Sequence, residues 1–307
     1  MLKSQILPGT APPVPRMACT ATGLAHAAIE SPRFAQREDR EIWSAGWVCV
    51  GTTVELVKTG DILPYTVGDQ GIHVARGEGG KLLGRFNMAP HGGCRFVPLQ
   101  CQTGAKTKCT VTSCGYSRDR GVMNAADELA THQYLGLRPE RLVPVPVYTQ
   151  DRLIFVNLGE QTSLPAPFLA QHALLEHGAT HREVWCEYGL NWKELPARLF
   201  GGADAQPHGD WLRAEIRCLD ETIEIRWMFP NLVLLLAQDS ACALVVQPTA
   251  LRLTMARVTG FGAQKDWHAM LRHLLCNDIT PDAPAARFLR TALARRMGPD
   301  APQGGRT

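Results

Sequence analysis

Four cysteines and one histidine lie close together in the first half of the chain, and thiolate and imidazole groups are common zinc and iron ligands in proteins. They are His91, Cys94, Cys101, Cys109 and Cys114. Four thiolates, or three of them with His91 as a substitute ligand, could hold a structural zinc ion in a tetrahedral arrangement. Such an ion would tie two loops together, because the free energy of metal binding becomes free energy of folding.

The spacing of these cysteines leaves other interpretations open. The chain lacks the Cys-x-x-Cys pair typical of zinc sites, although His91 and Cys94 form a His-x-x-Cys pair. The run C-x6-C-x7-C-x4-C matches no standard pattern of iron–sulfur ligands. Reduced thiols without a metal are therefore the favoured interpretation and structural zinc is the alternative. A Cys101–Cys109 disulfide is disfavoured in a reducing compartment.

A second candidate set is Asp204, His208 and Asp210, which offers one imidazole and two carboxylates for a mononuclear iron. Asp204 and His208 are four residues apart and would share one face of a helix. Glycine and proline residues in the same stretch favour a loop instead. Asp278 is the nearest candidate for a further ligand, and the sequence argues against iron here.

Two further groups of residues have less specific patterns. Three histidines recur at spacings of five and four and are interpreted as a solvated segment, namely His172, His177 and His181. Four aromatic residues could line a cavity for a small apolar ligand, although ordinary core packing is the favoured interpretation. They are Trp185, Trp211, Trp227 and Phe229.

Composition and charge exclude several classes of protein. The chain has 307 residues, 45% of them hydrophobic, and a formal net charge of +3, which is too small to indicate binding to nucleic acid. The longest purely apolar run, 232–237, is far shorter than the roughly 20 residues that span a bilayer. The first thirty residues carry no secretory signal pattern. We therefore expect a cytoplasmic protein with neither nucleic acid nor membrane as a partner.

The elements that must position these residues divide the chain into three parts. Residues 1–40 form a Pro-rich arm, expected to lack regular structure up to residue 30, followed by an initial helix. Residues 41–160 read as short antiparallel strands, with a turn at 77–81. Residues 161–307 read as an antiparallel sheet with helices on one side, and a frayed tail begins at 298. The predicted class is α+β.

The second half is predicted in more detail from its periodicity. Apolar runs and alternation predict five strands, at 214–218, 222–228, 232–237, 243–247 and 251–258. Helical spacing predicts helices at 265–276 and 285–297. The apolar residues of the last helix have no obvious internal partner in the sequence, so this helix and the Pro-rich arm are candidate contacts with another subunit.

Several of these stretches together resemble the α subunits of Rieske non-haem iron oxygenases, the ring-hydroxylating dioxygenase family. The stretch from Glu41 to Gly51 is similar to the start of the family's Rieske domain. His91-Gly92-Gly93 and Cys114-Gly115-Tyr116 fall where the two cluster-binding loops lie, and Asn191-Trp192-Lys193 matches the tripeptide that opens the catalytic-domain helix. The resemblance implies a Rieske-like β domain followed by a helix-grip-like α+β domain.

The ligand positions that the resemblance implies are largely lost. A Rieske [2Fe–2S] cluster needs Cys-x-His in one loop and Cys-x-x-His in the other. The chain has Ala89-x-His91 and Val111-x-x-Cys114 at these positions, so we expect no such cluster. In the family a mononuclear iron is held by two histidines and an aspartate. The two histidines lie one helical turn after Asn-Trp-Lys, where this chain has residues 203–210.

The sequence therefore predicts a degenerate member of this family. We expect a non-catalytic structural or regulatory subunit of an oxygenase assembly, in a homo- or hetero-oligomer that can include an active α subunit. The alternative is a mononuclear iron oxygenase component that hydroxylates or demethylates a small aromatic or amine substrate. It would receive its electrons from a separate Rieske protein.

Overall fold

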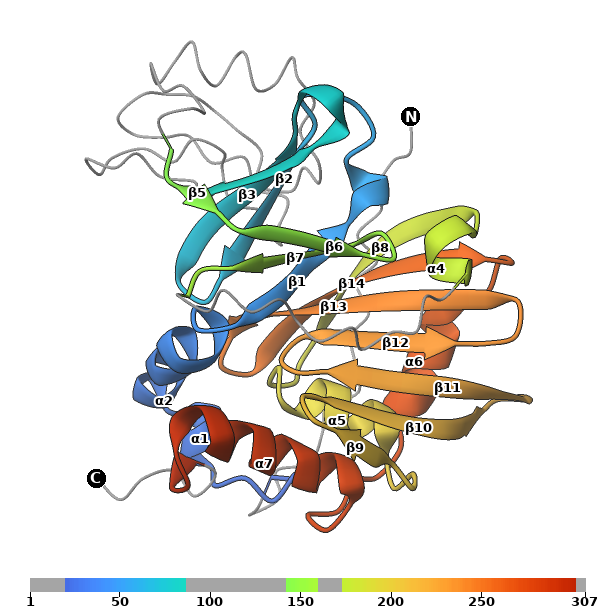
Figure 1. Cartoon of the computed structure of the whole chain (residues 1–307). Coiled ribbons are helices and arrows are strands. Elements are labelled where there is room, and N and C mark those ends of the chain that lie inside the picture. The colour runs from blue at the N-terminus through green and yellow to red at the C-terminus, as the bar shows by residue number, and fades with distance from the viewer. Residues whose placement is uncertain (1–19, 87–141, 160–172, 302–307) are drawn as a thin grey trace. The chain divides into compact units, whose positions relative to one another are not determined.

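The structure is a computed structural model, and it describes residues 20–86, 142–159 and 173–301. The chain divides into two compact units. The first contains residues 1–42 and 165–307, and the second contains residues 43–164. Each is described by itself, with the element labels of Figure 1.

The described part of the second unit consists of two small antiparallel sheets. The first has the order β1-β7-β6, with bounds β1 Trp47–Thr52, β6 Val147–Gln150 and β7 Leu153–Asn157. The other has the order β2-β3-β4-β5, with bounds β2 Ile62–Val67, β3 Gln70–Arg76, β4 Leu82–Phe86 and β5 Pro144–Val145. The predicted turn is confirmed, because a short 3-10 helix at Glu78–Gly80 joins β3 to β4.

The first unit is built on one antiparallel sheet of seven strands in the order β8-β14-β13-β12-β11-β10-β9. The five predicted strands are all present, and they extend beyond the predicted bounds at half of their ends. The bounds are β8 Thr180–Tyr188, β9 Gln206–His208, β10 Trp211–Cys218, β11 Glu221–Met228, β12 Leu232–Leu236, β13 Ser240–Ala250 and β14 Leu253–Gly262. The predicted α+β class is confirmed.

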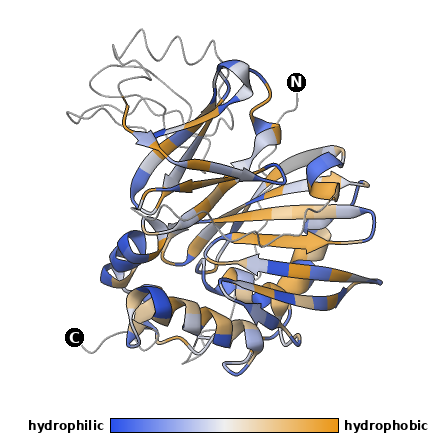
Figure 2. Cartoon of the chain, in the orientation of Figure 1, coloured by the Kyte–Doolittle hydropathy of each residue, from blue (hydrophilic) through white to orange (hydrophobic). Residues whose placement is uncertain are grey.

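Helices cover one face of this sheet and create its core. They are α4 Ala173–His177, α5 Glu194–Phe200, α6 Trp267–Leu275 and α7 Pro284–Met297. The Cys218 thiol contacts the Met270 carbonyl of α6, and the Trp227 ring packs edge-on against Phe288 of α7 with 5.3 Å between centroids. Figure 2 shows that β12 and β13 are hydrophobic along most of their length, whereas hydrophobic and hydrophilic residues alternate along β10 and β11.

Residues 20–42 belong to this unit and correct one expectation. The prediction that residues 1–30 lack regular structure is wrong for the described residues 20–30, where α1 spans Ala27–Glu30. The reason is burial of apolar side chains, since Leu24, Ala28 and Ile29 are each 2% exposed. Helix α2, Pro32–Glu38, begins after Ser31, whose hydroxyl accepts a hydrogen bond from the Phe34 amide, and a π-helical turn continues it to Trp43.

Two strands were not predicted. β8 lies at one edge of the sheet and mixes apolar with charged residues, so its alternation is weak. β9 is a strand of three exposed residues at the opposite edge, where a loop was expected. Pro207 is tolerated there because an edge strand has an outer side that makes no hydrogen bonds within the sheet.

Helix α7 corrects the expectation that its apolar residues lack an internal partner. Its apolar residues are buried within the unit, namely Ala285, Ala286, Phe288, Leu289, Ala292, Leu293 and Met297. The helix therefore stabilises its own sheet, and its apolar face is not available to another subunit. The Pro-rich arm, residues 1–19, lies outside the described residues.

None of the helices in residues 20–86, 142–159 and 173–301 is both long and apolar enough to cross a lipid bilayer.

We predict that Phe288→Ala lowers the free energy of unfolding by about 3–5 kcal/mol, because it removes a buried ring from the contact with Trp227 and leaves a cavity. Urea denaturation of the full chain measures the change. The exposed neighbour on the same helix supplies the control, and Arg287→Ala should change the free energy by less than about 0.5 kcal/mol. Equal effects of the two substitutions would contradict the packing described for α7.

Candidate functional site

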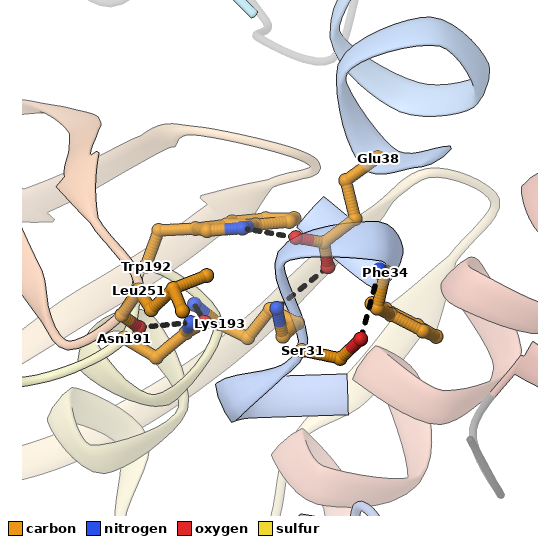
Figure 3. Close-up of polar contacts among 7 residues, drawn as sticks. All are labelled: Ser31, Phe34, Glu38, Asn191, Trp192, Lys193 and Leu251. Atoms are coloured by element: carbon orange, nitrogen blue, oxygen red, sulfur yellow. Dashed lines mark hydrogen bonds and ion pairs between the residues drawn. The ribbon is translucent and has the colours of Figure 1, made fainter. Parts of the chain in front are cut away.

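The tripeptide Asn191-Trp192-Lys193 lies at the start of α5, and its side chains form a buried polar network with α2 (Figure 3). The Lys193 ammonium is 0% exposed and lies 2.6 Å from one oxygen of Glu38, which is 4% exposed. The Trp192 indole donates to the other oxygen of the same carboxylate at 3.2 Å. Both oxygens of Glu38 therefore have partners in the two residues that precede α5.

Burial opposes the charge of both members of this pair. Removal from water raises the pKa of Glu38, and the Lys193 ammonium and the Trp192 indole oppose that rise. The same effect lowers the pKa of Lys193, opposed by Glu38. The rings of Trp192 and Phe34 lie 5.1 and 5.6 Å from the Lys193 nitrogen and add cation–π attraction. The charges are tolerated in the core because each has a close partner.

Asn191 connects the same segment to the β13–β14 hairpin. Its side-chain amide donates to the Leu251 carbonyl at 2.6 Å, and its side-chain oxygen accepts from the Lys193 amide at 3.1 Å. The Thr254 hydroxyl donates to the Leu190 carbonyl at 2.7 Å. Helix α5 then continues through Pro196, which its first turn tolerates, and ends before Gly201 with φ of 53°. The network positions α5 and offers no open coordination position.

The structure does not bring Asp204, His208 and Asp210 together as one ligand group. His208 lies on the exposed edge strand β9, and its ring stacks on Trp211 with 4.5 Å between centroids. Both oxygens of Asp210 are bound by α7, with Arg295 at 2.7 Å and Arg296 at 3.0 Å. Two guanidinium groups balance the negative charge of this carboxylate and occupy the oxygens that would otherwise be free to bind a metal ion.

More generally, the described ranges contain no cluster of three or more His, Cys, Asp or Glu side chains that could hold a metal ion. The first candidate set cannot be placed, because Ala89, His91, Cys94, Cys101, Cys109, Val111 and Cys114 lie outside the described residues. His172 also lies outside them, and the side chain of His181 is not described. His177 is exposed and lies 3.6 Å from Glu176.

The four candidate lining residues separate into two groups. Trp227 and Phe229 are buried in the core, which confirms the core interpretation for them. Trp185 and Trp211 are half-buried, and each lies near an arginine, with the Arg257 guanidinium 4.1 Å from the Trp185 ring and Arg226 5.9 Å from the Trp211 ring.

One polar cluster was not found from the sequence. The Cys186 thiol of β8 lies 3.2 Å from Nδ1 of His268 on α6, and the two residues are 82 positions apart. The Tyr188 hydroxyl lies beside Cys186 on the same face of β8. The i, i+2 spacing of Cys186 and Tyr188 is the one signal available locally, and nothing in the sequence links it to His268.

The electrostatics of this cluster favour neutral groups. Burial raises the pKa of both Cys186 and Tyr188, and it lowers the pKa of His268, with the Arg272 charge adding to the effect on the imidazole. A neutral thiol can donate to the unprotonated Nδ1 of a neutral imidazole. The arrangement therefore holds a thiol and an imidazole in contact, without an ion pair.

No protein-family model matches the chain. The glycine betaine monooxygenase oxygenase subunit of Chromohalobacter salexigens is 31% identical over 139 residues, which are 45% of this chain and 31% of that protein. Its counterpart in Pseudomonas aeruginosa is 27% identical over 167 residues, 52% of this chain and 38% of that protein.

Solved structures share the fold at lower identity. The quaternary ammonium Rieske monooxygenase CntA with L-carnitine has a TM-score of 0.62 at 13% identity, covering 89% of this chain and 95% of that chain. Naphthalene 1,2-dioxygenase with indole has a TM-score of 0.52 at 14% identity, covering 95% and 83%.

The fold is thus that of Rieske oxygenases, and the sequence matches identify the chain as a homologue of that family. The resemblance expected from the sequence is confirmed. The chain spans about a third of the length of the curated relatives it matches.

We predict that the Glu38–Lys193 pair shows strong coupling in a double-mutant cycle. Glu38→Gln and Lys193→Met should each cost about 3–5 kcal/mol, because each leaves one buried charge unpaired. The double variant should cost less than the sum by more than 0.5 kcal/mol. The Arg37–Glu41 pair, at 37% and 32% side-chain exposure, provides the control, and Glu41→Gln should cost less than about 1 kcal/mol. Additive losses for the buried pair would rule out the coupling.

The lowered pKa of His268 predicts a pH dependence of stability. A base whose pKa is lower in the folded state binds fewer protons there than when unfolded, so its contribution is present above pH ~6.5 and is lost as the pH falls through the folded-state pKa. The free energy of unfolding of His268→Gln should therefore fall less than that of the wild type between pH ~6.5 and ~5. The exposed His273 of the same helix supplies the control variant, His273→Gln. Parallel curves for wild type and His268→Gln would refute the assignment.

Proposed function

We propose that the chain is a Rieske oxygenase homologue without a Rieske cluster that acts as a non-catalytic structural or regulatory subunit of an oxygenase assembly. The observation that carries the proposal is chemical: Ala89 and Val111 stand where the two thiolate ligands are needed. Neither side chain has an electron pair to donate to iron. The residues present therefore do not fit a Rieske [2Fe–2S] cluster, and no electron-transfer step follows through one.

The first unit supports the same proposal. A catalytic iron of the facial-triad type needs two imidazoles and a carboxylate around one point, with open positions for substrate and oxygen. His208 is instead on an exposed edge strand, and Asp210 is neutralised by two arginines. These residues do not fit a mononuclear iron site. What the unit retains is the sheet, the helices and the network at Asn191–Lys193, which maintain shape.

The kind of partner follows from the relatives. CntA has been described as transferring electrons between subunits, so in that protein one subunit supplies a function to the next. A chain that keeps the fold but lacks ligands could occupy a subunit position without carrying electrons. The proposed partner is therefore an active oxygenase α subunit, with further copies of this chain as the homo-oligomeric alternative.

A second candidate function is favoured by the names of the relatives. Both curated relatives are glycine betaine monooxygenase oxygenase subunits, and CntA binds L-carnitine, so a quaternary ammonium compound is the substrate class this alternative would take. It requires an iron held by His208 and carboxylates, with electrons from a separate Rieske protein. The stacking of His208 on Trp211 argues against it.

We predict that the chain, purified under reducing conditions, shows no Rieske-type electron paramagnetic resonance signal after dithionite treatment and contains no stoichiometric iron. Elemental analysis measures iron and zinc in the same sample. A triple variant, Ala89→Cys with Val111→Cys and Cys114→His, restores the Cys-x-His and Cys-x-x-His pattern and serves as the positive control for the signal. Two irons per wild-type chain with acid-labile sulfide would overturn the proposal.

The same sample separates the two candidate functions. One iron per chain that is lost in His208→Ala would favour the oxygenase alternative.

Native mass spectrometry of the chain mixed with an active α subunit of the glycine betaine class tests the assembly role directly. A mixed oligomer is expected, and two separate homo-oligomers would contradict the hetero-oligomeric form of the proposal.

A further inference from the structure

Strand β10 has an open edge over most of its length. On one side it pairs with β11 from residue 211 to 218, and on the other side β9 pairs with residues 211–213 alone (Figure 1). Within the described part of the chain, no strand pairs with residues 214–218 on that outer side, and no backbone hydrogen bond joins them to a turn or loop. An open strand edge offers a row of backbone donors and acceptors to another strand.

The register of the sheet identifies the backbone groups that face outward. In an antiparallel pair, every second residue turns its N–H and C=O toward a given neighbour. Pro207 of β9 lies opposite Leu212 and has no N–H to donate, so Leu212 turns its backbone groups toward β11. By the same alternation, the odd-numbered residues of β10 turn theirs toward the outer edge. Beyond the end of β9 these residues are Glu215 and Arg217.

The side chains of this segment also alternate between two faces. Ala214, Ile216 and Cys218 are buried, and the Cys218 thiol contacts the helix α6. Glu215 and Arg217 alternate with them and lie exposed on the opposite face of the sheet. A strand paired with this edge would therefore continue both an apolar face and a charged face.

The two exposed charges have no partner in the part of the chain that the structure describes. Glu224 of β11 lies opposite Glu215, but its carboxylate binds Arg213 and Arg226. Neither Glu215 nor Arg217 forms an ion pair or a side-chain hydrogen bond with residues 20–86, 142–159 or 173–301. Charges of one sign on an edge deter pairing. A negative and a positive charge two residues apart instead make the edge complementary to itself.

We propose that β10 pairs with β10 of a second copy of this chain, in antiparallel orientation about a two-fold axis at Ile216. In this register Glu215 of each copy lies opposite the partner's Arg217, so two cross-strand ion pairs form on the exposed face. The outward backbone groups of the same residues meet, and each pair exchanges both N–H···O=C hydrogen bonds. The seven-stranded sheets of the two copies become one continuous sheet.

Charge and length both select this register. An axis at Glu215 would place two glutamates opposite each other, and an axis at Arg217 would place two arginines opposite each other, which is destabilising. An axis at Ile216 also fits the open length of the edge. The partner's strand turns away after its end at residue 218, and this is the point at which β9 begins to occupy the edge beyond residue 214.

This contact concerns self-association and goes beyond the proposed function. It needs neither the loss of a cluster nor an active α subunit, because its groups all belong to one strand of the first unit. Failure of the contact would leave the proposed function untouched. Conversely, a Rieske cluster in the purified chain would overturn the proposed function without bearing on this contact.

Charge reversal in the full chain tests the proposal, with the dimer dissociation constant measured by sedimentation velocity at low ionic strength. Glu215→Arg places arginine opposite arginine, and Arg217→Glu places glutamate opposite glutamate. Because of the two-fold axis, each single variant converts two attractive pairs into repulsive ones. The dissociation constant should therefore rise by about 10- to 100-fold in each.

Rescue of the contact is specific to the register. An equimolar mixture of the two single variants sets arginine opposite glutamate at both positions, so mixed dimers should form with an affinity close to that of the wild type. The doubly reversed chain, E215R with R217E, should associate with itself in the same way. Glu187→Arg on β8 and Arg287→Glu on α7 reverse exposed charges away from this edge and should leave the dimer intact.

Hydrogen exchange of the wild-type chain reports the backbone half of the contact and does not depend on the folding of any variant. The amides of Glu215 and Arg217 should become protected as the concentration rises through the dissociation constant. A chain that stays monomeric, reversals without effect, or single variants that fail to combine in the mixture would overturn the proposal. So would protection already present in the monomer, which would assign the edge to another segment of the same chain, or protection that needs an added active α subunit.

Discussion

The ion pair between Glu38 and Lys193 is the constraint on which the first unit depends. Two opposite charges have been withdrawn from water, and neither is tolerable in the core without the other. The pair connects α2 near the start of the chain with α5, across 155 residues. Because the Trp192 indole donates a hydrogen bond to the second oxygen of the Glu38 carboxylate, the orientation of that carboxylate is fixed and not only its charge balanced. Any movement of α2 relative to α5 would either expose one of these charges to water or leave it buried without a partner.

The same balance of charges explains why the candidate iron ligands of the first unit do not form a metal-binding arrangement. A carboxylate binds a cation only when its charge is not already satisfied, and Asp210 is held by Arg295 and Arg296 of α7. Helix α7 is in turn fixed by its apolar side, with Phe288 against Trp227. Helix α7 therefore both completes the core and supplies the arginines that bind Asp210, one of the predicted iron ligands.

The likeness to Rieske oxygenases that the comparisons show concerns the architecture. Antiparallel sheets make up that architecture in this chain, and the side chains of Asn191, Trp192 and Lys193 hold the start of α5 in place. Sheets and buried networks depend on volume, hydrogen bonding and charge balance, whereas a metal centre depends on individual donor atoms. A fold can consequently persist where individual donor atoms are replaced, and the proposed non-catalytic role rests on that difference.

Much of the fold was determined by local sequence pattern. The five central strands and the last two helices were predictable because periods of 2 and 3.6 residues are visible within a short window. The strands β8 and β9 were not, since both lie at sheet edges where fewer side chains are buried. The expectation that no Rieske cluster binds also comes from the sequence, because the side chains of Ala89 and Val111 have no electron pair for iron, and it stays a prediction since both residues lie outside the described ones.

Only the tertiary structure decided what the polar residues do. Lys193, Asp210 and Cys186 find their partners 155, 85 and 82 residues away. No local pattern specifies such pairings, because they are selected by the packing of whole helices against a sheet. The sequence supplies charges, thiols and rings, and the long-range contacts determine which are neutralised, which are stacked and which remain able to bind a ligand.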